Sequence, residues 1–461
     1  MGGRRARTLP GRISDLDTIA AIATPPGKGA IAVIRVSGPM APSLARRLFA
    51  GKQPLEPRRA SYGAILDERG TLVDRGVALL AVAPKSYTGE DTLELQVHGS
   101  PVVAREVLRV LLVCGARYAQ PGEFTRRAFL NGKLDLHAAG AVADLIDAES
   151  RSAARAAIAN LGGGLTNEVR RLRALLAALL EELAGSIDFP DEVPEPSRSE
   201  VRSRLDAIAA ALEILRRGGE VGRLVREGIG VAIVGPPNAG KSSLLNALLG
   251  EERALVSEIA GTTRDTIEES ILIDGVQVRL IDTAGIREHA DRLESAGIAR
   301  TQAALAGARI AVLVIDGSQP LSPEVLDLLI ATKDRARIVF FNKADIGNRG
   351  ALQAVLDGAI CGTVREHATL AALRAAIAQV GWQGETPDLE RPHLACLREI
   401  DAVNQALEAL DHARGTLQAE VPTDFVVGDL QRVFSLLGHL TGDGATEELL
   451  DGIFGRFCIG K

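Results

Sequence analysis

The chain has 461 residues, of which 46% are hydrophobic and 24% charged, and its formal net charge is −6 at pH 7. These totals predict a globular protein of about three domains, and they argue against a membrane span because no apolar run approaches the about 20 residues that a spanning helix needs. The four cysteines lie far apart and form no C-x-x-C pair, which argues against a disulfide framework or a cysteine zinc site and favours a reducing compartment.

The first residues, MGGRRARTLPGRISDLD, are rich in arginine but lack an apolar segment, and Asp15 and Asp17 interrupt them. We therefore expect a flexible tail and a cytoplasmic protein rather than a targeting peptide. Residues 1–135 carry more Lys and Arg than Asp and Glu, whereas the rest of the chain is acidic. This asymmetry hints at an anionic partner, although the arginine-rich tail supplies about half of the excess.

Residues 13–135 alternate short apolar runs with turns. The runs over 30–38, 76–84 and 92–99 are rich in Val, Ile and Leu and are bounded by Gly or Pro, which predicts strands. The stretch 101–115 between turns reads as a helix. We predict an α+β domain over residues 1–135.

Two later regions have a helical period. Apolar residues recur at steps of three and four in 136–225 and again in 387–461, and an acidic, proline-rich loop, DFPDEVPEPS, interrupts the first region. The simplest interpretation is one helical domain in two parts, 136–225 and 387–461. The periodic residues are Leu165, Val169, Leu172, Leu176, Leu179, Leu183, Val201, Leu205, Ile208, Leu212, Leu215, Leu394, Leu397, Ile400, Val403, Leu407 and Leu410.

Residues 226–386, between the two helical parts, alternate strands and helices. The segments GVAIVG, QVRLID, ARIAVLVID and ARIVFFN are apolar strands separated by helical stretches. This pattern predicts an inserted α/β domain with a mainly parallel sheet.

The segment GPPNAGKS, Gly235 to Ser242, fits the phosphate-binding pattern G-x-x-x-x-G-K-S and lies between a predicted strand and a predicted helix. Backbone amides of such a loop and the following helix N-terminus bind phosphate oxygens. Lys241 is suited to reach the β- and γ-phosphates, and Ser242 offers a hydroxyl to Mg²⁺.

Three further stretches follow in the order that a GTPase needs, namely GTTRD (261–265), DTAG (282–285) and NKAD (342–345). Thr263 can be a second magnesium ligand, and Asp282 can hold magnesium through water. Asp345 can accept two hydrogen bonds from guanine that adenine cannot donate, which predicts GTP. A fifth, base-packing loop is degenerate, and its best candidate is Thr363-Val364-Arg365.

The residue after DTAG is Ile286, which has no polar atom to orient the attacking water, a task that a Gln performs in familiar GTPases. The candidates for that task on the following segment are Glu288, Asp291 and Glu294, and each can equally be part of a solvated helix face.

From about residue 17 to 461 the chain closely resembles the tRNA uridine-5-carboxymethylaminomethyl modification GTPases, the MnmE/TrmE family. The resemblance rests on these segments in this order: TPPGKGAIAVIRVSG, YTGEDTLELQVHG, PGEFTRRAFLNGKLDL, DFPDE, GPPNAGKSSLLNAL, IAGTTRD, DTAGIRE and FCIGK. One departure is His98-Gly99-Ser100, where the family has His-Gly-Gly.

The resemblance implies a function. Members of this family modify the wobble uridine of certain tRNAs, together with a flavin-dependent partner protein that carries FAD. A 5-formyl- or methylene-tetrahydrofolate provides the one-carbon unit. The resemblance also implies a homodimer, a heterotetramer with the partner, and a potassium ion that takes the place of an arginine finger.

The resemblance assigns roles to residues at matching positions. Asn238, Ser257, Ile259 and Thr262 correspond to potassium ligands, and Ser242 and Thr263 to magnesium ligands. Glu294 corresponds to the carboxylate that positions water. Arg35, Glu94, Lys133 and Lys461 correspond to the folate site of the first domain. The GTP-contacting positions are Asn238, Ala239, Gly240, Lys241, Ser242, Ser243, Ser257, Glu258, Ile259, Ala260, Gly261, Thr262, Thr263, Asp282, Thr283, Ala284, Gly285, Asn342, Lys343, Ala344 and Asp345.

Cys458 lies near the carboxyl end, between Phe457 and Ile459. Taken alone, it reads as a small apolar filler beside a terminal helix that Phe454 and Phe457 dock. Within FCIGK, the resemblance implies a catalytic thiol near the folate.

Two rival hypotheses are a ribosome-assembly or signalling GTPase without base modification, and a folate-binding scaffold with an inactive GTPase domain. The first domain and FCIGK argue against the former, and intact Lys241 and Asp345 against the latter.

Overall fold

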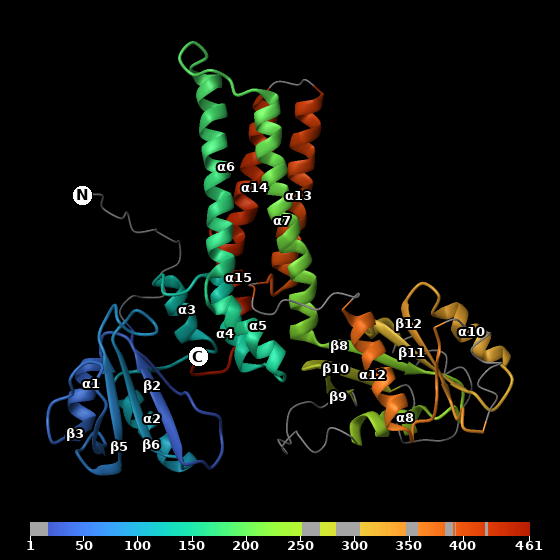
Figure 1. Cartoon of the computed structure of the whole chain (residues 1–461). Helices are drawn as coiled ribbons and strands as arrows, with labels where there is room; N and C mark the ends of the chain where they lie inside the picture. Colours follow the sequence, from blue (N-terminus) through green and yellow to red (C-terminus); the bar gives the residue numbers. More distant parts are fainter. Residues whose placement is uncertain are drawn as a thin grey trace. The chain divides into compact units, whose positions relative to one another are not determined.

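The computed structural model describes residues 17–250, 268–282, 305–346, 358–382, 391, 393–419 and 423–461. Figure 1 labels most of its helices and strands. Contacts between residues divide the chain into two compact units. The first comprises Met1–Ala143, Thr166–Ser203 and Glu408–Lys461, and the second comprises Asp144–Leu165 and Arg204–Leu407.

A seven-stranded sheet forms the centre of the first unit, in the order β3-β4-β5-β6-β2-β1-β7. Neighbouring strands are antiparallel except for β1 and β7, which are parallel. The predicted strands are confirmed as β2, β5 and β6, and the predicted helix as α2 (Pro101–Val113). The strands are β1 (Ile19–Ile22), β2 (Ile31–Ser37), β3 (Phe49–Gly51), β4 (Ser61–Leu66), β5 (Leu72–Ala81), β6 (Thr92–His98) and β7 (Arg117–Tyr118).

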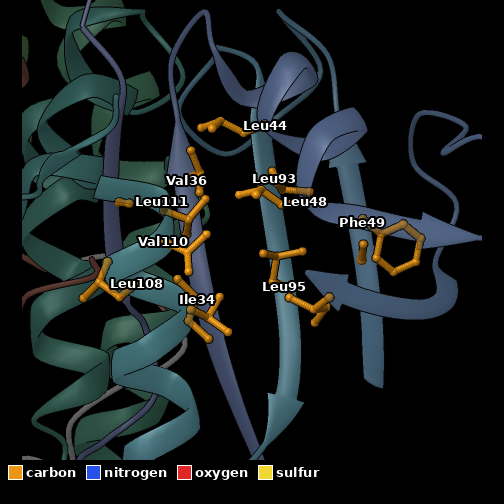
Figure 2. Packing of buried hydrophobic residues seen from close by; sticks show 14 of the residues in the cluster. Ile34, Val36, Leu44, Leu48, Phe49, Leu93, Leu95, Leu108, Val110 and Leu111 are labelled. Atoms are coloured by element: carbon orange, nitrogen blue, oxygen red, sulfur yellow. The ribbon is translucent and has the colours of Figure 1, made fainter. Parts of the chain in front are cut away.

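The core of this unit lies between the sheet and two helices, α1 (Ala41–Leu48) and α2. Along β2, Ile34 and Val36 are buried, as the period of two along a strand requires for one face. Figure 2 shows these residues beside Leu44 of α1 and Leu111 of α2. The amphipathic faces of both helices thus cover the sheet.

Long helices carry the predicted helical period. In α6 (Gly164–Asp188) the six predicted positions from Leu165 to Leu183 are all buried. Leu397 departs from the prediction, because it is the first residue of α13 (Leu397–Gln418) and is 60% exposed. The other helices outside the predicted α/β insertion are α3 (Glu123–Leu130), α4 (Leu136–Ile146), α5 (Arg151–Leu161), α7 (Arg198–Glu227), α14 (Thr423–Thr441) and α15 (Glu447–Phe454).

The second unit contains a six-stranded sheet in the order β13-β12-β11-β8-β10-β9. Its strands are parallel except for the antiparallel pair β9 and β10, so the predicted mainly parallel sheet is confirmed. The carboxyl ends of the parallel strands therefore meet at one edge. The strands are β8 (Ile229–Val234), β9 (Glu268–Ile273), β10 (Val276–Asp282), β11 (Ile310–Asp316), β12 (Ala336–Asn342) and β13 (Ile360–Cys361).

Both faces of this sheet are covered, which explains its continuous apolar strands. In β8, Val231 and Ile233 pack in a cluster with α8 (Lys241–Gly250) and α12 (His367–Gly381). The intervening Ala232 and Val234 pack on the opposite face, in a cluster with α10 (Pro323–Ala331). The multidomain α/β and α+β fold class is confirmed. Within the ranges that the structure describes, no helix has the length and apolar character to cross a membrane.

Candidate functional site

The phosphate-binding loop joins the buried strand β8 to α8. Two positions of this loop require glycine, because a side chain there would collide with neighbouring atoms. A Cβ on Gly235 would lie 2.2 Å from the carbonyl oxygen of Val314, and one on Gly240 would lie 2.2 Å from the Asn342 side-chain nitrogen. Gly240 also has φ +99, which side chains disfavour. The loop therefore closes tightly against the neighbouring strand ends and leaves the α8 N-terminus beside it.

Lys241 is the first residue of α8. Its Nζ donates to the carbonyl oxygens of Gly235 at 2.9 Å and Pro236 at 2.8 Å. The ammonium group thus lies over the loop that a phosphate chain would occupy, and it can exchange these carbonyl oxygens for phosphate oxygens. Ser242 and Ser243 follow and are exposed, so the Ser242 hydroxyl is accessible to a magnesium ion.

Asn342 and Lys343 connect the NKAD segment to this loop. The Asn342 side-chain nitrogen donates to the Ala239 carbonyl at 2.9 Å, and its Oδ1 accepts from the Val364 amide at 3.3 Å. Lys343 Nζ donates to the Asn238 carbonyl at 2.9 Å. The predicted base-binding and phosphate-binding segments therefore form one hydrogen-bonded assembly.

Asp345 is exposed and lies in the turn after β12. The loop after β13 is held beside this turn, because the Ala344 amide donates to the Gly362 carbonyl at 3.0 Å. Val364 is bonded to Asn342 as described above, so the degenerate Thr363-Val364-Arg365 loop lies at the predicted base-binding segment. Thr363 is buried and Arg365 is exposed.

Asp316 is a site residue that the sequence reasoning missed. It ends β11, and its Oδ2 pairs with Lys343 Nζ at 2.7 Å, while Ser318 donates to its Oδ1 at 2.6 Å. Partial burial raises the pKa of Asp316, but the hydrogen bonds from Lys343 and Ser318 outweigh burial and hold the pKa below its ordinary value. The sequence did contain a signal that could have identified Asp316, namely an acidic residue at the carboxyl end of an apolar segment predicted to be a buried parallel strand.

Asp282 ends β10, next to β8 in the sheet, which places its backbone at the same edge as the phosphate-binding loop. Several predicted residues lie outside the described ranges: Glu294, Ile286, Glu288, Asp291, Ser257, Glu258, Ile259, Ala260, Gly261, Thr262, Thr263, Thr283, Ala284 and Gly285.

A second cluster of predicted residues lies in the first unit. Arg35 of β2 and Glu94 of β6 face each other in the strand register, and Arg35 Nε pairs with Glu94 Oε1 at 2.9 Å. The Arg35 guanidinium lies 5.6 Å from the ring centre of Tyr87 and 5.8 Å from that of Phe124. Tyr87 and Phe124 were not singled out from the sequence, although both lie in segments that carry the family resemblance.

The carboxyl-terminal segment returns to this cluster. Arg35 Nη1 donates to the Gly460 carbonyl at 3.3 Å, and the Phe124 amide donates to the Lys461 carbonyl at 3.1 Å. Ile459 forms a β-bridge with Pro121. Cys458 is exposed, so it is not the apolar filler of the simple structural interpretation, whereas Phe454 and Phe457 are buried as that interpretation expects.

Lys133 reaches the same loop that carries Tyr87. Its Nζ donates to the Pro84 carbonyl at 2.9 Å, and Pro84 and Tyr87 both lie between β5 and β6. Tyr87 in turn bonds to the Thr125 hydroxyl at 2.9 Å. Of the four predicted folate positions, Arg35 and Glu94 therefore lie on adjacent strands and Lys461 lies on the terminal segment. The fourth, Lys133, contacts the loop between β5 and β6.

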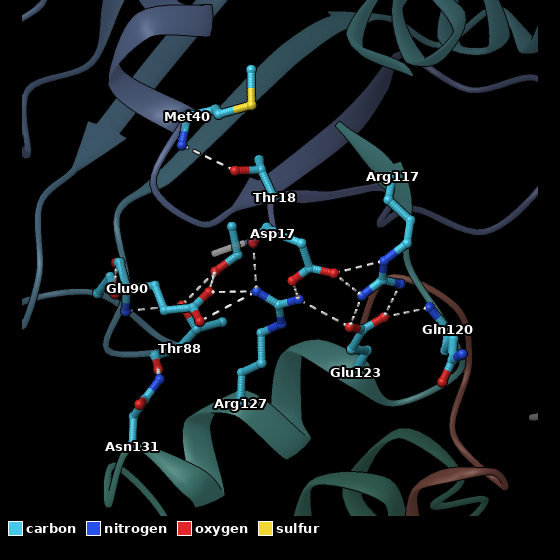
Figure 3. A network of polar contacts seen from close by, with 12 residues as sticks. Asp17, Thr18, Met40, Thr88, Glu90, Arg117, Gln120, Glu123, Arg127 and Asn131 are labelled. Carbon is cyan, nitrogen blue, oxygen red and sulfur yellow. Dashed lines mark hydrogen bonds and ion pairs between the residues drawn. The ribbon is translucent and has the colours of Figure 1, made fainter. Parts of the chain in front are cut away.

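A buried polar network holds α3 in place beside this cluster (Figure 3). Glu123 pairs with Arg117 at 2.6 Å and with Arg127 at 3.0 Å, and Arg127 also pairs with Asp17 and Glu90. Both Glu123 and Arg127 are less than a tenth exposed. Because each charged group has several partners, the network orients α3 and hence Phe124.

Two family models match the chain. One, described as the GTP-binding protein TrmE N-terminus, matches residues 18–133, and one, described as the MnmE helical domain, matches residues 136–458. A tRNA modification GTPase MnmE from Chloroflexus aurantiacus is 43% identical over 457 residues, which cover 96% of this chain and 100% of that relative. Relatives with the same name come from Laribacter hongkongensis, 43% identical over 96% of this chain and 99% of the relative, and from Lactiplantibacillus plantarum, 39% identical over 97% and 99%.

Proposed function

Because the chain belongs to the MnmE family of tRNA modification GTPases, we propose that it hydrolyses GTP in a potassium-dependent reaction and modifies the wobble uridine of certain tRNAs. The product carries a carboxymethylaminomethyl or aminomethyl group at C5 of that base. The reaction uses a one-carbon unit from 5-formyl- or methylene-tetrahydrofolate. The protein acts as a homodimer with a flavin-dependent partner that carries FAD.

The arrangement around the phosphate-binding loop supports the GTP part of this proposal. Lys241 lies over the loop. Asp345 lies in the turn that follows Asn342 and Lys343, and the side chains of these two residues donate hydrogen bonds to the same loop. Asp345 would select guanine by accepting from N1–H and the exocyclic amine. Ser242 and Thr263 would hold Mg²⁺, with Asp282 acting through water.

Asn238 supports the potassium part. It has φ 61 and is exposed at the loop, in a left-handed conformation that Asn tolerates. Its amide oxygen would join oxygens of Ser257, Ile259 and Thr262 around the ion. A monovalent cation there supplies charge neutralisation between the β- and γ-phosphates. Glu294 would position the attacking water, since Ile286 has no polar atom for this task.

One observation carries the tRNA modification part, namely the hydrogen bond from Arg35 to the carbonyl of Gly460. It brings the segment with Cys458 and Lys461 to the sheet positions of Arg35 and Glu94. This cluster combines a guanidinium, a carboxylate and aromatic rings, which are groups suited to a planar, hydrogen-bonding pterin. Cys458, exposed on the same segment, would lie near the one-carbon carrier.

Nucleoside mass spectrometry of tRNA from a deletion strain tests the proposal. We expect the modified wobble uridine to disappear, to return with the wild-type chain, and to stay absent with Lys241→Ala, which removes the phosphate-binding ammonium. Cys458→Ser should also fail to restore it while it still hydrolyses GTP. An unchanged wobble uridine in the deletion strain would contradict the proposed function.

A further inference from the structure

The segment that carries Cys458 continues directly from α15, whose last residue is Phe454. The geometry of α15 therefore constrains where the thiol lies, together with the contacts of Ile459 and Gly460 described above. Two contacts join the segment to the start of α3, since the Gly122 amide donates to the Cys458 carbonyl at 3.4 Å and the Phe124 amide to the Lys461 carbonyl at 3.1 Å. These backbone bonds alone do not fix the preceding helix.

Arg126 connects α3 to α15. Its guanidinium forms ion pairs with Glu447 and with Asp451, the latter at 3.2 Å. The two acids are four residues apart and so lie on one face of α15. The Arg126 side chain is 9% exposed, whereas Glu447 and Asp451 are 45% and 67% exposed. Removing the acids would leave a buried charge without these partners, which is unfavourable.

Close packing on the same side of α3 makes the contact specific. A Cβ on Gly122, which has φ +64, would lie 2.5 Å from the Phe454 carbonyl. The ring centres of Phe129 and Phe454 are 6.4 Å apart, and those of Phe454 and Phe457 are 5.5 Å apart. Apolar packing thus brings the helices together with Leu450 and Phe454 buried. The ion pairs of Arg126 with Glu447 and Asp451 add a polar contact between the same two helices.

We propose that Arg126 is a positioning residue, which holds α15 through Glu447 and Asp451 and thereby places the Cys458 segment against α3 and Arg35. Arg126 does not touch the reacting groups. Its contribution to tRNA modification rests on the proposed function, but its effect on the terminal segment is a property of this chain alone.

Hydrogen exchange of the full-length protein tests the placement without requiring folate or tRNA. In Arg126→Ala we expect the amides of residues 446–461 to exchange severalfold faster, because α15 loses both of its ion pairs to α3, and solvent screening at the exposed acids keeps the effect moderate. Exchange in β2 and β6 should stay unchanged. Trypsin cleavage after the exposed Arg456 should accelerate in parallel. Arg126→Lys, which keeps the charge, should be intermediate.

Two further variants sharpen the test. Glu447→Gln combined with Asp451→Asn leaves Arg126 in place and should reproduce the faster exchange, and it decides the question if Arg126→Ala does not fold. Arg171→Ala, which removes the exposed pair with Glu168 on α6, should change nothing. Unchanged exchange at 446–461 in both the Arg126→Ala protein and the double variant would overturn the proposal.

Activity then separates positioning from simple stability. We expect Arg126→Ala to lower the turnover of tRNA modification while GTP hydrolysis stays at the wild-type rate. Faster exchange with normal modification would overturn the positioning role. If the wild type itself modifies no tRNA, the proposed function fails, whereas the exchange result still decides whether Arg126 holds the segment.

Discussion

Asp316 and Lys343 form an ion pair of 2.7 Å at the carboxyl ends of the neighbouring parallel strands β11 and β12. The same Lys343 ammonium donates to the carbonyl of Asn238 in the phosphate-binding loop. Asp316 thus fixes a side chain that joins the NKAD segment, the predicted base-binding segment, to the GPPNAGKS loop, although it is part of neither.

Asp316→Asn should weaken GDP and GTP binding about fivefold. The Lys343 side chain is 36% exposed, so solvent screening limits the loss to about 1 kcal/mol. Titration with a fluorescent GDP analogue measures the effect. Asp327→Asn, at an exposed acid on α10, is the matched control and should bind like the wild type. Equal affinities for both variants would show that the pair does not position Lys343.

Asp345→Asn should lose GTP and accept xanthosine triphosphate. A site built around a hydrogen-bond pair can discriminate by roughly 10⁴, and the substitution exchanges an acceptor for a donor. Competition binding with the two triphosphates and with ATP measures the preference. Equal binding of ATP and GTP by the wild type would refute the role of Asp345.

GTP hydrolysis should be much faster in potassium than in sodium at equal ionic strength, because the proposed oxygen cage of Asn238, Ser257, Ile259 and Thr262 suits the larger ion. Glu294→Ala should lower turnover and leave nucleotide affinity and potassium-dependent dimerisation intact, since it acts on water. Steady-state rates in each salt, and sedimentation with a transition-state mimic, provide the readouts. Identical rates in the two salts would contradict the cation site, and full activity of Glu294→Ala would contradict the water-positioning role.

Cys458→Ser should abolish tRNA modification while GTP binding and hydrolysis remain normal. The expected reason is loss of the exposed thiol that the proposed function places near the one-carbon carrier, whereas the predicted GTP-binding segments lie elsewhere in the sequence. Modification assays and GTPase assays on the same preparation compare the two activities, with Cys114→Ser at a buried cysteine as a control for substitution of a thiol. Normal modification by Cys458→Ser would assign the residue a structural role.

The Glu123 carboxylate makes the folding stability of the protein depend on pH in the acid range. Burial raises the pKa of Glu123, but hydrogen bonds from Arg117, the Gln120 amide and Arg127 outweigh burial and hold the pKa below its ordinary value of 4.5. Because the folded pKa is depressed, this contribution to stability is present above pH 4.5 and is lost as the pH falls through the folded pKa. The melting temperature should therefore fall steeply below that pH.

Glu123→Gln should be destabilised at neutral pH by about 1–3 kcal/mol, because Arg117 and Arg127 lose one carboxylate partner but keep their pairs with Asp17 and Glu90, and its melting temperature should depend less on pH in the acid range. Circular dichroism from pH 7 to pH 3 measures both effects. Glu106→Gln, at an acid 42% exposed, should follow the wild-type profile. A Glu123→Gln profile as steep as that of the wild type would rule out this carboxylate as the source of the acid sensitivity.

Local sequence patterns predicted the elements and the phosphate-binding loop well. Strand and helix periods are local, so β2, β6, α2 and the apolar face of α6 follow from the residues themselves. Leu397 shows the limit of this approach. The Glu399 carboxylate accepts from the Ala395 amide at 2.7 Å, which caps the start of α13 and leaves Leu397 on the exposed first turn despite its periodic position.

Contacts between distant segments were beyond local patterns. The pairing of Arg35 with Glu94 depends on the register of β2 and β6, and a slip of one residue in either strand would turn that strand's side chain to the other face. The pairs of Arg126 with α15 and of Asp316 with Lys343 depend on tertiary packing in the same way. Residue types and spacing in one sequence do not determine such long-range registers.

The Asn342 side chain occupies the space that a side chain at position 240 would need, because a Cβ at position 240 would lie 2.2 Å from the Asn342 side-chain nitrogen. The two positions are therefore not free to drift independently in evolution. A lineage that shortened the side chain at 342 would relieve the collision, but φ +99 at position 240 would still disfavour any residue with a Cβ. The steric constraint is thus one-sided: a shorter side chain at 342 leaves glycine at 240 acceptable but loses the hydrogen bonds of Asn342 to Ala239 and Val364, whereas a change at 240 has no simple compensating substitution at 342.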